Sequence, residues 1–182
     1  MQEIINKLTA KDDKFACAMA DRIIAESREA DAWYEYFDVF ATLLNHPKSL
    51  IQNRALHILA ANARWDAENR FDAILPEFLT HVADEKPITA RQCIHALAEV
   101  GLVKPQYIPQ ILSCFHNADL SKYKDSMRPL IEKDMAAAED IWNRRKSESQ
   151  TSTLETNPGG GTVTITNQLR GFFVNSGILL SF

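Results

Sequence analysis

Glycine is nearly absent from most of this chain. Of its six glycines, only Gly101 precedes residue 159. The glycine run NPGGGT at 157–162 has no following Lys-Ser/Thr pair and no helical pattern behind it, which excludes a phosphate-binding P-loop. The uneven distribution of glycine indicates that the composition of the chain changes near residue 147. We expect a body at 1–146 and a distinct C-terminal segment at 147–182.

Cysteine and long apolar runs are also scarce. The three cysteines, Cys17, Cys93 and Cys114, have no paired spacing, and the first residues lack the apolar region of a secretion signal. No stretch approaches the roughly 20 apolar residues that a membrane span requires. We therefore expect a cytoplasmic protein in a reducing setting, without a membrane partner.

Patterns that carry chemistry are missing as well. No Cys-x-x-Cys or His-x-x-x-His pair is present to hold zinc, and no cysteine has an evident base beside it. The carboxylates Asp66, Glu68, Asp72, Asp84 and Glu85 fall at expected helix starts, where capping is favoured over acid–base catalysis. The sequence therefore predicts a protein without catalytic residues, metal or cofactor.

The body has the composition and the periodicity of a helical protein. Apolar residues make up 46% of the chain and charged residues 24%, so a sizeable core is expected. Apolar residues recur at spacings of three and four, and breaks fall at 45–49, 84–87, 101–105 and 117–121. We expect an all-α domain of antiparallel neighbours with short links, ending in a helix at about 121–145.

The helical segments repeat along the body. A shift of 38 residues aligns Ala55 with Cys93, and a further shift of 33 aligns Cys93 with Ser126, while apolar positions around them also coincide. One helix pair cannot bury its apolar stripe alone, whereas stacked pairs can. Segments 2–8 and 12–28 are expected to form a more degenerate capping pair.

These pairs resemble HEAT repeats of the armadillo-type α-solenoids, as found in small bacterial proteins. The resemblance rests on a proline inside the first helix, at 74–79 and 108–112, and on a small–x–x–x–Leu pattern in the second, at 55–59 and 93–97. Tetratricopeptide and ankyrin signatures are absent. The resemblance implies a right-handed α-α superhelix of about four HEAT-like helix pairs, with the second helices lining a concave face.

Two histidines share one position of the repeat. His57 and His95 align, and the third copy has Arg128 at the same place. Arginine neither titrates near neutral pH nor binds metal. This column is therefore interpreted as an outward-facing surface position rather than as part of an active site.

The expected concave face is basic to polar on a chain whose net charge is −4. Its candidate partner-binding residues form two repeat columns: Asn53, Arg91 and Lys124, and His57, His95 and Arg128. Arg and Lys there favour a protein or acidic peptide segment, and the resemblance implies a non-catalytic interaction module or scaffold. The alternative is binding to the phosphate backbone of nucleic acid, which an acidic chain with few cations favours less.

The C-terminal segment at 147–182 begins rich in Ser, Thr and Gly and continues with alternating Thr, Val and Ile. The first part is typical of flexible linkers, and the second is β-prone but too short for an independent sheet. We expect a poorly ordered or loosely docked tail, which is either an appendage without function or a short interaction strand.

Overall fold

A computed structural model describes residues 2–154, with side chains up to residue 148. The chain divides into two units, Met1–Glu148 and Ser149–Phe182, and all the described side chains belong to the first. Every regular element in the described part is helical, which confirms the all-α prediction there. The α-helices are α1 (Gln2–Leu8), α2 (Asp13–Glu29), α3 (Phe37–Ala41), α4 (Ser49–Asn62), α5 (Arg70–Thr80), α6 (Pro87–Val103), α7 (Ile108–Asn117) and α8 (Arg128–Leu154). Short 3₁₀ helices at 34–36, 63–65, 81–83 and 105–107 adjoin them.

The last helix begins and ends later than predicted. It was expected at about 121–145, whereas α8 runs from Arg128 to Leu154 and passes through the expected boundary between residues 146 and 147. Residues 147–154, predicted to begin a flexible linker, are helical and belong to α8. The rest of the predicted linker, the interaction strand and the poorly ordered tail lie outside the described residues.

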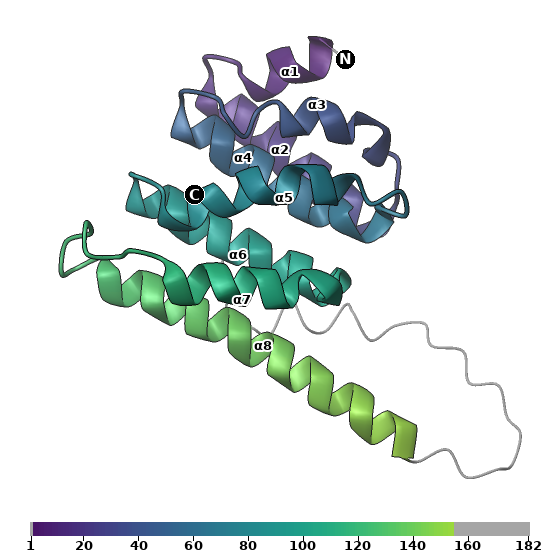
Figure 1. Cartoon of the computed structure of the whole chain (residues 1–182). Coiled ribbons are helices and arrows are strands. Elements are labelled where there is room, and N and C mark those ends of the chain that lie inside the picture. The colour runs from purple at the N-terminus through teal and green to yellow at the C-terminus, as the bar shows by residue number, and fades with distance from the viewer. Residues whose placement is uncertain (1, 155–182) are drawn as a thin grey trace, which may run out of the picture. The chain divides into compact units, whose positions relative to one another are not determined.

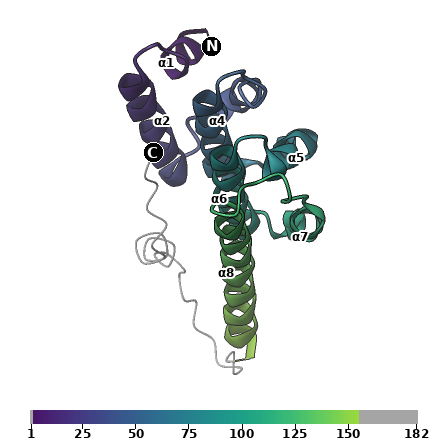
Figure 2. The ribbon, with the colours of Figure 1, turned by 90° about the vertical axis from the view of Figure 1, so that its left-hand side faces the viewer.

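The helices of the first unit form two layers. Helices α2, α4, α6 and α8 follow one another in one layer, and α3, α5 and α7 lie beside them in the other (Figures 1 and 2). Helix α4 packs against both α2 and α6. Hydrogen bonds join α6 to α8, among them one of 3.0 Å from Trp142 Nε1 to the Ala98 carbonyl oxygen. We call α2, α4, α6 and α8 the second helices, because each follows a shorter helix in the chain.

One pattern of buried positions recurs in all four second helices. Successive shifts of 35, 38 and 42 residues carry Ala16 to Ile51, then to Thr89 and then to Ile131. The residues four, seven and eleven positions further on are also buried in every helix. This 4-3-4 spacing is the apolar stripe of a helix that packs along its length. Small residues fill many of these positions, such as Ala55 and Cys93, and so allow the helices to approach closely.

The structure corrects the third copy of the predicted repeat. The predicted shift of 33 residues aligned Ser126 with Cys93, which is buried, but Ser126 is exposed and precedes α8. The same shift aligns Leu130 with the buried Leu97, yet Leu130 is 38% exposed. The correct shift from α6 to α8 is 42 residues. It is larger because the link at 118–127 between α7 and α8 is longer than the link at 84–86 that leads into α6. The core of α8 is formed instead by Ile131, Met135, Ala138 and Trp142.

Local chemistry sets several helix boundaries. Asp12 caps α2, its Oδ1 accepting from the backbone N–H groups of Lys14 at 3.0 Å and Phe15 at 3.2 Å. Pro76 lies inside α5 as predicted, whereas Pro109 falls in the first turn of α7, where a missing backbone donor is harmless. Gly101, expected at a break, lies inside α6, and Trp142 packs directly against it.

Candidate functional site

The predicted binding face contains two residues that are not on the surface. Asn53 is 4% exposed and His57 is 2% exposed, so the prediction that His57 points outward is wrong. The physical reason is coverage: α4 lies between α2 and α6, and every residue from 53 to 63 is buried. The side chains of Asn53 and His57 therefore belong to the packed interior of the described unit and not to an exposed binding face.

His57 makes its polar contact with the next second helix. Its Nε2 lies 2.5 Å from Oε1 of Gln92 on α6. Burial lowers the pKa of the His57 imidazole, and the hydrogen bond to Gln92 only partly opposes this. The ring therefore stays neutral in the folded protein at pH values where an exposed histidine takes up a proton.

Acidification is expected to destabilise the fold through His57. Below about pH 6.5 the unfolded histidine binds a proton that the folded one does not, so stability falls as the pH drops toward the lowered folded pKa. Thermal unfolding between pH 7.5 and 5.5 should show a decline in Tm for the wild type and a shallower decline for His57→Gln. Parallel profiles of the two proteins would contradict this role for His57.

Arg91 and His95 direct their donors to a carboxylate on α8. Arg91 Nε lies 2.5 Å from Asp134 Oδ2, and His95 Nε2 lies 3.2 Å from Asp134 Oδ1. Burial opposes ionisation of Asp134, but these two donors outweigh it and hold the pKa of the carboxyl below its ordinary value. Two of the predicted binding residues are thus engaged in joining α6 to α8.

The remaining two predicted residues are more accessible. Lys124 is exposed, in the link before α8. The Arg128 side chain is 39% exposed, with Nη2 3.8 Å from Asp125 and hydrogen-bonded at 3.4 Å to the Tyr123 carbonyl oxygen. The structure therefore divides the six residues into a buried pair, a pair joined to Asp134 and a more exposed pair beside the start of α8.

One repeat position, missed from the sequence, links α4, α6 and α8 each to the structure before it. It holds Arg54, Gln92 and Asp134, under the shifts of 38 and 42. Arg54 is 4% exposed and donates to the Leu8 carbonyl oxygen at 3.0 Å and to Asp13. Gln92 and Asp134 each contact the preceding second helix. The incorrect shift of 33 hid this column, because it did not align Asp134 with Gln92.

A second polar cluster centres on the buried Glu99 of α6. Arg28 at the end of α2 binds it with two hydrogen bonds, of 3.0 Å from Nε and 2.7 Å from Nη2. Arg64, next to the end of α4, has Nη2 at 3.7 Å from the same carboxylate. The bidentate geometry is that of a strong charge-assisted pair, so we assign this cluster to structural support.

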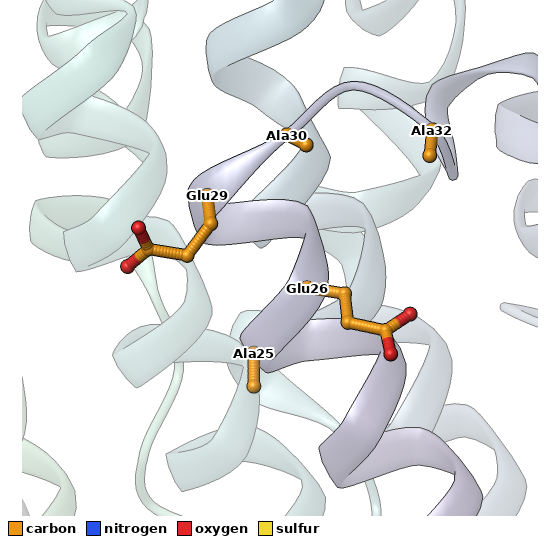
Figure 3. A pocket seen from close by; sticks show the side chains of 5 residues that line it. All are labelled: Ala25, Glu26, Glu29, Ala30 and Ala32. Atoms are coloured by element: carbon orange, nitrogen blue, oxygen red, sulfur yellow. The ribbon is translucent and has the colours of Figure 1, made fainter.

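The three cysteines and a surface depression in the described part show no reactive arrangement. Burial raises the pKa of the thiols of Cys17, Cys93 and Cys114, which keeps them in the unreactive protonated form. A depression at the C-terminal end of α2 includes Glu26 and Glu29 in its lining, and Figure 3 shows their carboxylates pointing in different directions. Within residues 2–148, no three metal-binding side chains gather into a cluster.

Comparisons with models of known families, with characterised proteins and with solved structures give no match to this chain. Among the helices of the described part, none is both long enough and apolar enough to cross a membrane.

Proposed function

We propose that the chain is a HEAT-like repeat protein, a right-handed superhelix of about four helix pairs, that binds a protein segment and has no catalytic activity of its own. The observation that carries the proposal is the recurrence of one buried 4-3-4 pattern in α2, α4, α6 and α8. Side-by-side helices with equivalent cores present equivalent surface positions in a row. Extended rows of this kind are the surfaces that repeat proteins use for binding.

The use of the polar side chains supports a non-catalytic role. The carboxylates of Asp66, Glu99 and Asp134 are each held by donors from other elements. Burial raises the pKa of the Cys93 thiol, and His57 is buried against Gln92. These carboxylates and this imidazole, groups of the kinds that enzymes use as bases, are engaged here in contacts between elements. Free thiols at all three cysteines also fit the cytoplasmic setting that we propose.

An acidic protein segment is the partner that the surface favours. The cations on the predicted binding face that remain accessible, Lys124 and part of Arg128, lie together at the start of α8. Arg and Lys recognise carboxylates through charge-assisted hydrogen bonds. The buried Asn53 and His57 cannot take part without local unfolding.

The proposal is tested by selection from a displayed random peptide library, followed by titration of the selected peptides in solution. We expect saturable binding of peptides enriched in Asp and Glu, and no binding of a labelled DNA duplex at physiological salt. A library that yields no ligand, together with duplex binding that weakens steeply as salt is raised, would favour the nucleic-acid alternative instead.

A further inference from the structure

The large apolar side chains that are exposed in the described part of the chain share one location in the fold. They are Phe15, Leu50, Ile88 and Leu130, with exposed fractions of 50%, 51%, 63% and 38%. Each second helix contributes one of them, at its second or third residue. Single exposed apolar residues are common on proteins, but a set confined to one position of a repeat calls for an explanation.

These four residues are equivalent under the repeat. The shifts of 35, 38 and 42 residues that align the buried positions carry Phe15 to Leu50, then to Ile88 and then to Leu130. Figure 1 shows the turns that lead into α4, α6 and α8 on the same side of the unit. Neighbouring packed helices lie about 8–10 Å apart, so the four side chains form a row roughly 25–30 Å long. We call this set the apolar row.

Positive charge accompanies the apolar row at the helix starts. Lys48 and Lys86 are the N-cap residues of α4 and α6, each two positions before its member of the row, and Arg128 is the equivalent in α8. Lys48 and Lys86 are exposed, and their ammonium groups form no ion pair or hydrogen bond within the side chains described. The acidic neighbours have other partners: Glu85 contacts Lys122 and Asp13 contacts Arg54.

Lysine is an unfavourable choice at this position. The N-terminus of a helix carries partial positive charge, which favours acidic side chains, and N-caps are usually Ser, Thr, Asp or Asn. Neither Lys48 nor Lys86 makes a side-chain capping bond, whereas Asp12 caps α2 in the normal way. A locally unfavourable charge in successive repeats, beside an exposed apolar side chain each time, indicates selection for binding rather than for stability.

We propose that the apolar row, with Lys48, Lys86 and Arg128 beside it, is the docking surface for an acidic amphipathic helix of a partner protein. This assignment rests on the proposed interaction function and specifies its surface. Seven residues of an α-helix rise about 10.5 Å, close to the spacing of the second helices, so apolar side chains repeated every seventh residue meet successive members of the row. An extended strand fits poorly, since side chains three residues apart point to opposite faces.

The test uses the full chain and a fluorescein-labelled helical peptide of roughly 25 residues, with Leu at every seventh position and Glu on either side of each. A peptide of the same composition with the leucines scrambled is the control ligand. Fluorescence anisotropy should show saturable binding of the first peptide alone. Binding should weaken at least tenfold in each of two double variants, Leu50→Ser with Ile88→Ser and Lys48→Glu with Lys86→Glu.

A stability readout separates a binding surface from a structural one. Because Glu at an N-cap interacts favourably with the helix dipole, the Tm of Lys48→Glu with Lys86→Glu should equal or exceed that of the wild type. Arg144→Glu with Lys146→Glu makes the same change of charge far along α8 and should leave binding intact. A clear fall in Tm for the first pair, or equal binding by all the proteins, would overturn the proposal.

The remaining outcomes identify other occupants and so also overturn it. Co-sedimentation with phosphatidylserine vesicles but no peptide binding would assign the row to an anionic membrane surface. A dimer in sedimentation velocity that Leu50→Ser with Ile88→Ser dissociates would assign it to a second copy of the chain. If library-selected peptides bind the wild type and both row variants equally, the interaction function stands and this surface assignment fails. If no peptide of any kind binds, both fail.

Discussion

Replacement of Asp66 by alanine is expected to lower the free energy of unfolding by about 3 kcal/mol or more. Asp66 is fully buried. Its Oδ1 accepts from Tyr34 Oη at 2.5 Å and from the Arg70 backbone N–H at 2.7 Å, and its Oδ2 accepts from the Phe71 backbone N–H at 3.0 Å. Lys104 Nζ lies 3.7 Å from Oδ2 and also donates to the Asp66 carbonyl oxygen.

One carboxylate therefore joins three parts of the fold. It caps the start of α5, holds the tyrosine that precedes α3 and attracts the lysine that follows α6. Alanine would leave the Tyr34 hydroxyl and the Arg70 and Phe71 backbone N–H groups without this acceptor, whereas Lys104 would keep its bond to the backbone carbonyl of residue 66. Unsatisfied buried groups cost more than the bonds themselves contribute.

Urea unfolding followed by circular dichroism measures the effect. Tyr34→Phe is the matched control, because it removes only one hydroxyl group and should cost about 1 kcal/mol. Loss of less than that amount in Asp66→Ala would show that the carboxylate does not have this joining role.

The second large effect is expected at Gly101, where alanine should destabilise the protein by about 1–3 kcal/mol. In an ordinary helix the same change stabilises, by about 1 kcal/mol, because glycine is a poor helix former. Here a Cβ atom would lie 2.5 Å from Cε2 of Trp142, far inside van der Waals contact. The indole is 4% exposed, and its Nε1 is bound to the Ala98 carbonyl oxygen, so it has little room to move.

A double-mutant cycle isolates this contact. In a Trp142→Leu background the steric conflict is reduced, so Gly101→Ala should become neutral or stabilising even though Trp142→Leu is itself destabilising. Thermal or urea unfolding of the four proteins supplies the comparison. If Gly101→Ala is equally harmful in both backgrounds, the close approach of Trp142 is not the reason that glycine stands there.

The sequence was sufficient to predict the helical class and the equivalence of α4 and α6, because Ala55 and Cys93 occupy the same small buried position in these two helices. It was insufficient for α8. Periodicity shows the spacing of residues within a helix, but it gives no information on the length of an irregular link such as 118–127. The alignment of α8 with α6 was therefore wrong, and Asp134 was overlooked. His57 shows a different limit. A helical pattern shows which residues share a face, but not that α2 and α6 cover the remaining sides of α4.

The docking surface was only partly visible in the sequence. Leu50 and Ile88 have the spacing of ordinary members of an apolar stripe, and Lys48 and Lys86 resemble ordinary charged residues of a turn. Their significance depends on exposure and on the helix start two residues earlier, and both of these are properties of the fold. Leu130 is equivalent to Leu50 and Ile88, and Arg128 to Lys48 and Lys86, only when α8 is aligned with the correct shift.

The pair formed by Arg28 and Glu99 has a consequence for the way in which the unit unfolds. In a linear repeat array each repeat contacts only its neighbours, so an end can fray while the rest stays folded. Arg28 on α2 instead reaches α6 and passes the intervening α4. Opening of the N-terminal pair would therefore break a contact in the third pair, and amide hydrogen exchange in α2 and α6 should report one cooperative event rather than two.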